Sequence, residues 1–299
     1  MHSEIVDFYE YIRPSKQDIH KREQGFRAIK TLFETEIPGS KCFKFGSAAT
    51  QLFLPKADID MVILNKGLSS EELFKKAKKV VKNAEERFQN VEFVESARVP
   101  LIKFCEPTSG FEFDVCFNEE GGLFAIQEVV TALEHYPEIK YLFLILKIFL
   151  RQRKMHNSYT GGIGSFLLFC MLLHFLRDHK ARVVRDMGTY AVQNLTLSHL
   201  LLQFLLYYGV VFNYADLEID MTKSPNIQKK KDRNNSFSLV SPQDPTQNLG
   251  YACFKFYEIF RIFKNRYNYI TNLEHQRGDS MLVHLINPLK GIFDRMESH

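Results

Sequence analysis

Two acidic residues in one apolar segment are the side chains best suited to chemistry in this chain. Asp58 and Asp60 stand one residue apart, directly before the aliphatic run 61–64, and the pair Gly46-Ser47 precedes them by eleven residues. In an extended strand, alternate side chains project to the same face, so both carboxylates would point the same way. Like charges this close repel unless a cation lies between them, and hard divalent ions prefer oxygen ligands. The pair therefore predicts half of a metal site.

The remaining ligand is expected from a second strand, 111–117, in which aromatic and aliphatic residues alternate with acids. The segment 98–105 and residues 106–110 are typical of its hairpin partner and turn. Asp114 would then lie beside the earlier pair. Glu112 has the same parity on this strand, so alternation alone does not choose between the two acids.

A long apolar segment, 139–153, carries two basic residues four positions apart, Lys147 and Arg151. On a helix both side chains would reach in the same direction, where they could neutralise phosphate charge. The alternative is an ion pair between Lys147 and an internal Asp or Glu, because a Lys buried without a partner is costly.

Four further residues allow both a binding and a structural interpretation. Gly46 and Ser47 either bring backbone N–H groups to phosphates at a helix start or form an ordinary strand-to-helix turn. Ser165, at the start of the expected helix 164–178, either contacts a phosphate or serves as the N-cap. The ring of Phe166 either stacks on a base or belongs to the core of this Leu/Phe-rich helix.

Taken together, these segments resemble the DNA polymerase β-like nucleotidyltransferase superfamily, and within it the noncanonical poly(A) polymerases of the TRAMP type. Two later segments, 207–214 and 242–250, are similar to the region after the family's next long helix and to its nucleotide-recognition loop. All blocks occur in the family's order and cover roughly residues 20 to 270 of the chain. The motifs that carry the resemblance are Gly46-Ser47, Asp58-x-Asp60, Asp114, the block 141–176 and the two later segments.

The resemblance implies a template-independent RNA 3′-adenylyltransferase that adds AMP from ATP by a two-metal mechanism. Its catalytic and metal-binding residues would be Asp58, Asp60 and Asp114, which would hold Mg²⁺, with Mn²⁺ as the alternative ion. The nucleotide-binding residues that it implies are Gly46, Ser47, Lys147, Arg151, Ser165, Phe166, Gln247 and Asn248.

Several residues depart from the family pattern and leave the base preference open. Ser241, Gln247 and Tyr251 replace residues that the family usually has in its recognition loop, and Gly164-Ser165-Phe166 replaces Ser-Ser-Tyr. A terminal uridylyltransferase of the same superfamily and a catalytically inactive scaffold are therefore the alternatives. Clustered carboxylates argue against the scaffold, because their repulsion would bring it no benefit.

The hydrophobic pattern predicts an α+β chain. The resemblance implies a nucleotidyltransferase catalytic domain with a mixed sheet and flanking helices at 20–133, and a mostly helical central domain formed by 1–19 and 134–299. The pattern predicts helices at 3–12, 16–36 and 70–88, strands at 41–46, 57–64, 91–105 and 111–117, and mainly helices from about residue 123 onward.

Composition is consistent with an intracellular enzyme. The chain has 299 residues, 45% of them hydrophobic, which is enough for a sizeable core. Its five cysteines form no C-x-x-C pair, so we expect reduced thiols and no structural zinc. Neither a signal sequence nor a membrane span is expected, because the apolar runs are short or interrupted by Lys147 and His174. The resemblance implies the nucleus.

The net charge of +4 is mild for a protein that acts on RNA. Lysines 75, 76, 78, 79 and 82 are expected on the solvated face of the helix 70–88, opposite an apolar stripe. The run 229–233 is interpreted as a mobile loop, with an RNA contact as the alternative. From the low charge and the resemblance we infer partners that supply RNA 3′ ends, namely a zinc-knuckle RNA-binding protein and an RNA helicase.

Overall fold

The computed structural model describes residues 1–299 except 55–56, 98, 232, 274–279 and 288–299. The chain divides into two compact units. Residues 12–130 form one, here called the strand unit, and residues 1–11 and 131–299 form the other, here called the helical unit. Helix α5 (Gly121–His135) begins in the first and ends in the second. The domain boundaries at 20 and 133 that the resemblance implies stay a prediction.

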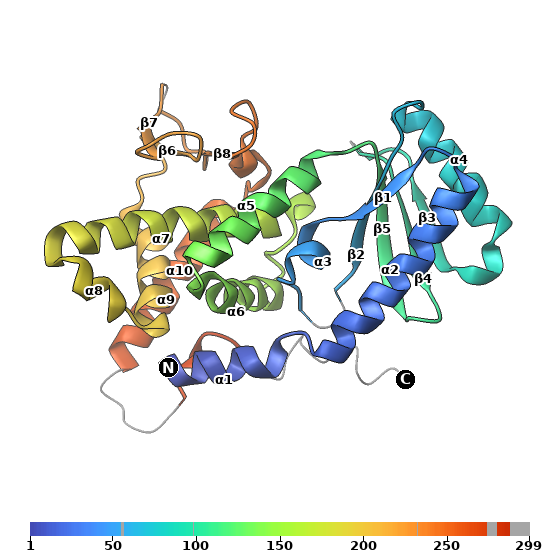
Figure 1. Ribbon diagram of the computed structural model, residues 1–299. Helices are drawn as coiled ribbons and strands as arrows, with labels where there is room; N and C mark the ends of the chain where they lie inside the picture. The colour runs from blue at the N-terminus through green and yellow to red at the C-terminus, as the bar shows by residue number, and fades with distance from the viewer. Residues whose placement is uncertain (55–56, 98, 232, 274–279, 288–299) are drawn as a thin grey trace. The chain divides into compact units, whose positions relative to one another are not determined.

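The strand unit contains a five-stranded mixed sheet with two long helices, α2 and α4 (Figure 1). The strand order is β1-β2-β5-β4-β3, in which β2 and β5 are parallel and the other neighbours are antiparallel. The elements are α2 (Lys16–Glu36), β1 (Lys41–Lys44), α3 (Gly46–Thr50), β2 (Ile59–Leu64), α4 (Ser70–Asn83), η1 (Glu85–Arg87), β3 (Gln89–Val94), β4 (Leu101–Glu106) and β5 (Phe111–Phe117).

Both long helices begin at capping boxes that the sequence encodes. Ser15 and Asp18 form one at the start of α2, and Ser69 and Glu72 form the other at the start of α4. The apolar faces of these helices pack against one face of the sheet in a single core. The lysines of α4 lie opposite that face, and all except the half-buried Lys78 are exposed, which confirms the solvated helix face expected from the sequence.

Three local expectations for this unit need correction. The expected strand 91–105 is two strands, β3 and β4, that pair antiparallel. The expected helix 70–88 ends at Asn83, where the backbone of Ala84 leaves the helical conformation and η1 follows. Asp58 lies directly before β2 and not within it, because the strand begins at Ile59. Strand β4 is the expected hairpin partner of β5, which confirms the turn at 106–110.

The helical unit is built mainly from long helices (Figure 1). Their apolar side chains form its core. Helices α6 and α7 contact each other, and α9 and α10 pack together with the π-helical turn η3. The elements are α1 (His2–Ile12), α6 (Glu138–Gln152), η2 (Ser158–Thr160), α7 (Ser165–Met187), α8 (Thr189–Gln193), α9 (Leu197–Leu206), η3 (Tyr207–Val211), η4 (Leu249–Ala252), α10 (Phe256–Leu273) and η5 (Leu282–His284).

A small sheet, with strand order β7-β6-β8, completes this unit. Its strands are β6 (Leu217–Asp220), β7 (Ile227–Lys229) and β8 (Leu239–Val240). The Nζ of Lys230 donates to the carbonyl oxygens of Tyr214 at 2.6 Å and Ser236 at 2.6 Å, and only 9% of Lys230 is exposed. The expectation of a mobile loop at 229–233 is therefore wrong for Lys230, because its ammonium group holds the loop together.

The cysteines agree with the sequence-based expectation of reduced thiols. All five are free, and four of them are buried. Burial raises the pKa of the Cys42 and Cys253 thiols to about 12. Among the helices of the described part of the chain, none has both the length and the apolar character needed to cross a membrane.

Candidate active site

The parallel pairing of β2 and β5 places two of the predicted acids at neighbouring positions. Asp60 and Asp114 are register partners across these strands, and both are half-buried. The alternation of each strand explains this position, because Ile59, Met61, Phe113 and Val115 turn to the opposite face and are fully buried. The sheet core therefore fixes the face from which the two carboxylates project.

The backbone of Gly46 lies close to the carboxylate of Asp60. Its φ of +58° lies in the left-handed region, and a Cβ on this residue would lie 2.6 Å from Oδ2 of Asp60. Only glycine satisfies both conditions without strain. Gly46 and Ser47 begin α3, so the prediction of a helix start after the first strand is confirmed.

Asp114 is joined to a cation on its other side. Lys103 on β4 is its cross-strand partner, and the Lys103 Nζ lies 2.5 Å from Oδ2 of Asp114. Burial raises the pKa of Asp114, with the charge of Asp58 acting in the same direction and Lys103 opposing it. Burial acts to lower the pKa of Lys103, but the hydrogen bond and charge of Asp114, together with the charges of Asp58 and Glu92, raise it. Lys103 thus balances the negative charge that accumulates at this edge of β5.

Asp58 has a buried cation in its neighbourhood, Arg22 of α2. The guanidinium of Arg22 lies between the rings of Phe53 and Phe111, at 4.5 and 4.3 Å from their centroids, and 6% of the residue is exposed. Burial lowers the pKa of Arg22, whereas the charges of Asp18 and Asp58 act to raise it. The charge of Asp58 is thus one of the two that partly offset the burial of Arg22.

The structure brings the three predicted carboxylates into one region of the strand unit without joining them into one ligand cluster. Asp60 and Asp114 are register partners, and Asp58 acts on Asp114 through its charge. Within the described residues, no three His, Cys, Asp or Glu side chains are grouped closely enough to hold one metal ion. Asp114 instead forms an ion pair with Lys103. Glu112, the alternative by parity, is exposed.

Lys147 and Arg151 lie on the same helix, α6, and both are half-buried. The Nζ of Lys147 lies 5.7 Å from the ring centroid of Phe143, one turn earlier. Burial lowers the pKa of His156, and the positive charges of Arg151 and Lys147 act in the same direction. The helical unit therefore gathers positive charge at this end of α6.

Ser165 and Phe166 are the first two residues of α7. Gly164 is the N-cap, so Ser165 is the first helical residue and its side chain is exposed. The N-cap alternative for Ser165 is therefore wrong. Phe166 is half-buried and stacks on Phe169, with ring centroids 6.1 Å apart. The ring of Phe166 thus retains an accessible surface.

Gln247 and Asn248 have different local environments in the loop before η4. The Oδ1 of Asn248 accepts hydrogen bonds from the backbone N–H groups of Leu239 and Gly250, and its Nδ2 donates to Oγ of Ser238. The amide of Asn248 therefore holds the loop in place. Gln247 is exposed and is the better placed of the two for contact with a ligand.

Two charged residues near the acids, Lys103 and Arg22, are absent from the sequence-based prediction, although the sequence contains a signal for each. The hairpin turn at 106–110 pairs Glu106 with Phe111, and the same register places Lys103 opposite Asp114. Arg22 occupies a position in the helical stripe 19, 22, 26, 29 and 33, whose other members are apolar. A charge within an apolar stripe indicates a buried partner or a functional role.

Comparison with known proteins gives a family match for the first part of the chain. Residues 1–127 match the family described as "Poly(A) RNA polymerase, mitochondrial-like, central palm domain". This range includes Gly46, Ser47, Asp58, Asp60 and Asp114.

Curated relatives match most of this chain. It is 32% identical over 281 residues to "Poly(A) RNA polymerase protein 2" of Saccharomyces cerevisiae, covering 90% of this chain and 47% of that protein. It is 30% identical over 253 residues to a Drosophila melanogaster protein named as an inactive noncanonical poly(A) RNA polymerase, covering 82% of this chain and 61% of that protein. The chain spans about half the length of the first curated relatives that it matches.

A solved structure has the same fold. The polymerase core of TRAMP, an RNA surveillance complex, matches with a TM-score of 0.80 and 28% identity, covering 96% of this chain and 93% of that one. This similarity confirms the predicted α+β nucleotidyltransferase fold with its mixed sheet and flanking helices. Sequence similarity over nine tenths of the chain and the shared fold identify it as a homologue of the noncanonical poly(A) RNA polymerases.

Proposed function

We propose that this protein is a template-independent RNA 3′-adenylyltransferase, which transfers AMP from ATP to RNA 3′ ends. The observation that supports the proposal most directly is the pairing of Asp60 with Asp114 on adjacent parallel strands. Gly46 lies beside this pair, at a turn from strand to helix where its positive φ and its closeness to Asp60 require a glycine. Carboxylates held on adjacent strands of a rigid sheet can bind the divalent ions that assist nucleotidyl transfer, and a backbone turn beside them can approach phosphates.

The donor set of Asp58, Asp60 and Asp114 fits a hard divalent ion such as Mg²⁺ or Mn²⁺, because all three offer carboxylate oxygens. When bound, such ions supply charge neutralisation for the triphosphate and activate the 3′-hydroxyl. In this structure the positive charge of Lys103 neutralises the carboxylate of Asp114. Lys103 would have to give up its ion pair with Asp114 for that carboxylate to hold an ion, and the positive charge of Arg22 would attract Asp58.

The remaining predicted residues have roles toward the nucleotide. Lys147 and Arg151 would neutralise the β- and γ-phosphates, and the α3 start at Gly46 and Ser47 would contact them through backbone N–H groups and a hydroxyl. Ser165 would add a hydrogen bond to a phosphate, because its hydroxyl is exposed at the start of α7. Phe166 would stack on the base, and Gln247 would read its edge while Asn248 holds the loop.

The test is primer extension with an oligo(A) primer, ATP and Mg²⁺. We expect Asp60→Asn and Asp114→Asn each to reduce extension at least 1,000-fold, because both remove a carboxylate that no neighbour replaces. The matched control is Glu92→Gln, an exposed acid on β3, which should retain wild-type extension. Glu112→Gln tests which acid is the third catalytic carboxylate. If Glu112→Gln loses activity and Asp114→Asn retains it, Glu112 and not Asp114 has that role.

Two outcomes would contradict this function. Undiminished tailing by folded Asp58→Asn/Asp60→Asn protein would exclude the site. Wild-type protein that binds ATP and RNA but adds no nucleotide would instead favour the inactive scaffold, a state named for the Drosophila relative. We expect ATP to be used faster than UTP, CTP or GTP, and faster use of UTP would favour a terminal uridylyltransferase.

We further propose that the protein acts in nuclear RNA surveillance and exosome-linked decay. The similarity to the polymerase core of TRAMP supports this assignment, as that core belongs to an RNA surveillance complex. The expected partners are a zinc-knuckle RNA-binding protein and an RNA helicase. The net charge of +4 supports a requirement for partners, because few phosphates can be neutralised by the chain alone.

A further inference from the structure

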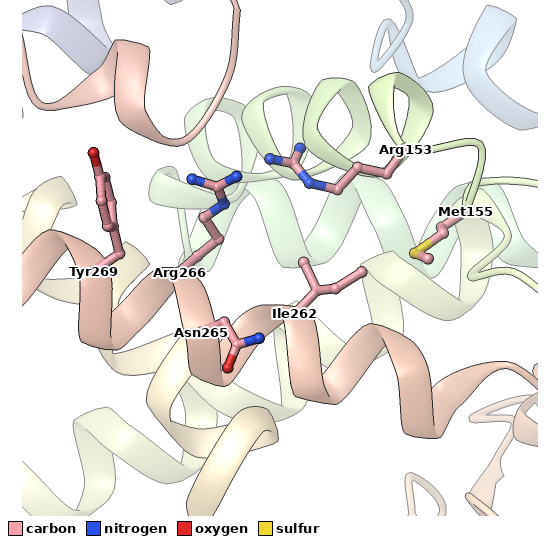
Figure 2. Close-up of a pocket in the computed structure, with 6 residues that line it drawn as sticks. All are labelled: Arg153, Met155, Ile262, Asn265, Arg266 and Tyr269. Atoms are coloured by element: carbon pink, nitrogen blue, oxygen red, sulfur yellow. The ribbon is translucent and has the colours of Figure 1, made fainter.

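A pair of arginines in the helical unit, Arg153 and Arg266, has no carboxylate partner among the residues that the structure describes. Arg153 follows the last residue of α6, and Arg266 lies on α10. Figure 2 shows the two guanidinium groups turned toward each other above Ile262, with Tyr269 at one end and Met155 at the other. Like charges held together in this way favour an anion between them or beside them.

Carbonyl oxygens, not carboxylates, hold these two side chains. Arg153 donates from Nη1 to the Phe149 oxygen at 2.9 Å and from Nη2 to the Leu285 oxygen at 3.1 Å. Arg266 donates from Nη1 to the His284 oxygen at 3.1 Å. Within the described residues, neither guanidinium lies within 4.0 Å of a carboxylate oxygen. Carbonyls orient the two groups without neutralising them, and each guanidinium keeps N–H donors for a ligand.

The electrostatics of Arg153 agree with an unneutralised pair. Burial lowers the pKa of Arg153 to about 10, and the charge of Arg266 acts in the same direction. The Arg153 guanidinium also lies 3.8 Å from the ring centroid of Phe149, which fixes its plane. A planar cation held in one orientation is suited to bidentate recognition of an oxyanion.

Two cavities meet at this pair of arginines. One, of about 550 Å³, is lined by Met155, Ile262 and Asn265, and the other, of about 500 Å³, by Gln152 and the segment 283–287. Arg153, Arg266 and Tyr269 line both. Each cavity has the size of a small-ligand site. A flexible chain could therefore cross from one cavity to the other with a charged group at the arginines.

We infer that this paired cavity, here called the arginine groove, binds single-stranded RNA, with a backbone phosphate on Arg153 and Arg266 and a base on Tyr269. The Tyr269 ring is 46% exposed and lies 5.8 Å from the Arg266 guanidinium. Aromatic surface beside a cation is the combination that single-stranded nucleic acids use for stacking and phosphate contact. The inference rests on the proposed function only in taking RNA as the substrate, and it adds an RNA site separate from the residues assigned to ATP.

The test measures binding of labelled 20-nucleotide oligo(A) by fluorescence anisotropy, without ATP or divalent ions. We expect Arg266→Gln to weaken binding about fivefold to tenfold and to reduce the log-log salt slope by about 0.7, the increment for one phosphate contact on a single strand. Tyr269→Leu should weaken binding about fivefold or more through lost stacking, with the salt slope unchanged. The matched control is Arg261→Gln, an exposed arginine on the same helix that does not line either cavity.

Further variants distinguish a loss of RNA binding from misfolding and from a loss of catalysis. Arg266→Lys keeps the positive charge and a donor for the His284 oxygen, so RNA affinity should stay within about threefold of wild type. Retained affinity would show that the segment 283–287 keeps its position in this variant. In primer extension, Arg266→Gln should raise the KM for oligo(A) and leave kcat unchanged. Asp60→Asn should retain wild-type RNA affinity, so that a failure of the proposed catalysis leaves the groove assignment standing.

Three results would overturn the inference. One is unchanged RNA affinity in both Arg266→Gln and Tyr269→Leu. Another is equal weakening by Arg261→Gln, which would indicate a diffuse charge effect. A third is Arg266-dependent binding of an oligo-glutamate peptide with no Arg266 dependence for RNA, which would assign the groove to an acidic protein partner.

Discussion

At the scale of single residues, burial determines what each charged or polar side chain can do. His174 on α7 is 1% exposed, and its Nε2 lies 3.0 Å from the hydroxyl of Tyr207. Burial lowers the pKa of His174 to about 4, with the charges of Arg182 and Arg177 in the same direction and Asp178 opposing them. The ring is therefore neutral in the folded protein at neutral pH. This makes His174 a source of acid sensitivity in the helical unit.

Stability should fall as the pH decreases from 6.5 toward 4. In this range the unfolded chain binds a proton at His174 that the folded chain does not, so unfolding is favoured by roughly 2 kcal/mol at pH 5 relative to pH 7. His174→Phe should lose this component, and urea unfolding at pH 7 and pH 5 measures it. His135→Gln, which removes an exposed histidine, should behave as wild type. An equal loss of stability between the two pH values in His174→Phe and wild type would contradict the assignment.

At the scale of elements, close backbone approaches position the helices of the helical unit. Gly209 lies in the π-helical turn η3, and a Cβ on it would lie 2.5 Å from the backbone nitrogen of Lys264 on α10. The rings of Tyr208 and Phe260 lie next to this contact, with centroids 5.6 Å apart. A side chain at position 209 must therefore separate η3 from α10, because backbone atoms cannot move aside as a flexible side chain can.

Gly209→Ala should destabilise the protein by about 1–3 kcal/mol, the usual cost of overpacking a close contact. Thermal unfolding followed by circular dichroism measures the decrease in Tm. The matched control is Gly164→Ser, because Gly164 has a φ of −66° at the N-cap of α7. A Cβ added there would lie 3.6 Å from its nearest neighbour, the Cβ of Ser158, which is an ordinary contact. Serine there should leave Tm unchanged or raise it slightly. Equal Tm values for Gly209→Ala and wild type would show that the contact is not tight.

At the scale of the whole molecule, charge limits how the chain can hold RNA. The lysines of α4 are solvated or paired, as with Lys75 and Glu71, and Lys230 is engaged by its own loop. The α4 lysines and Lys230 are thus not concentrated for RNA, in contrast to the two arginines of the arginine groove. The one phosphate that Arg153 and Arg266 hold there would contribute a log-log salt slope of only about −0.7 on a single strand.

We therefore expect the isolated chain to bind oligo(A) weakly and to lose that binding as salt rises. It should add short tails, and a basic zinc-knuckle protein should lengthen them by keeping RNA bound between additions. Tail length on denaturing gels, with and without that protein and with albumin as the control, measures this dependence. Tight, salt-resistant binding and long tails from the chain alone would show that it carries a more extensive RNA site.

The sequence by itself determined the elements and the local chemistry. Capping residues such as Ser15 and Ser69 set the helix starts, and alternation along β2 and β5 set which residues face the core, because these patterns depend on neighbours within a few positions. The hairpin turn at 106–110 also fixed the register of β4 with β5. The fold class followed from these patterns together with the family resemblance.

Only the tertiary structure decided which charges meet. Parallel pairing of β2 with β5 joins residues more than fifty positions apart, and it made Asp60 and not Asp58 the register partner of Asp114. The same packing buried Arg22 near Asp58 and turned Arg153 and Arg266 toward each other from two helices. These contacts join residues that are far apart in the sequence, and their burial depends on how whole elements pack. No local sequence pattern therefore encodes them.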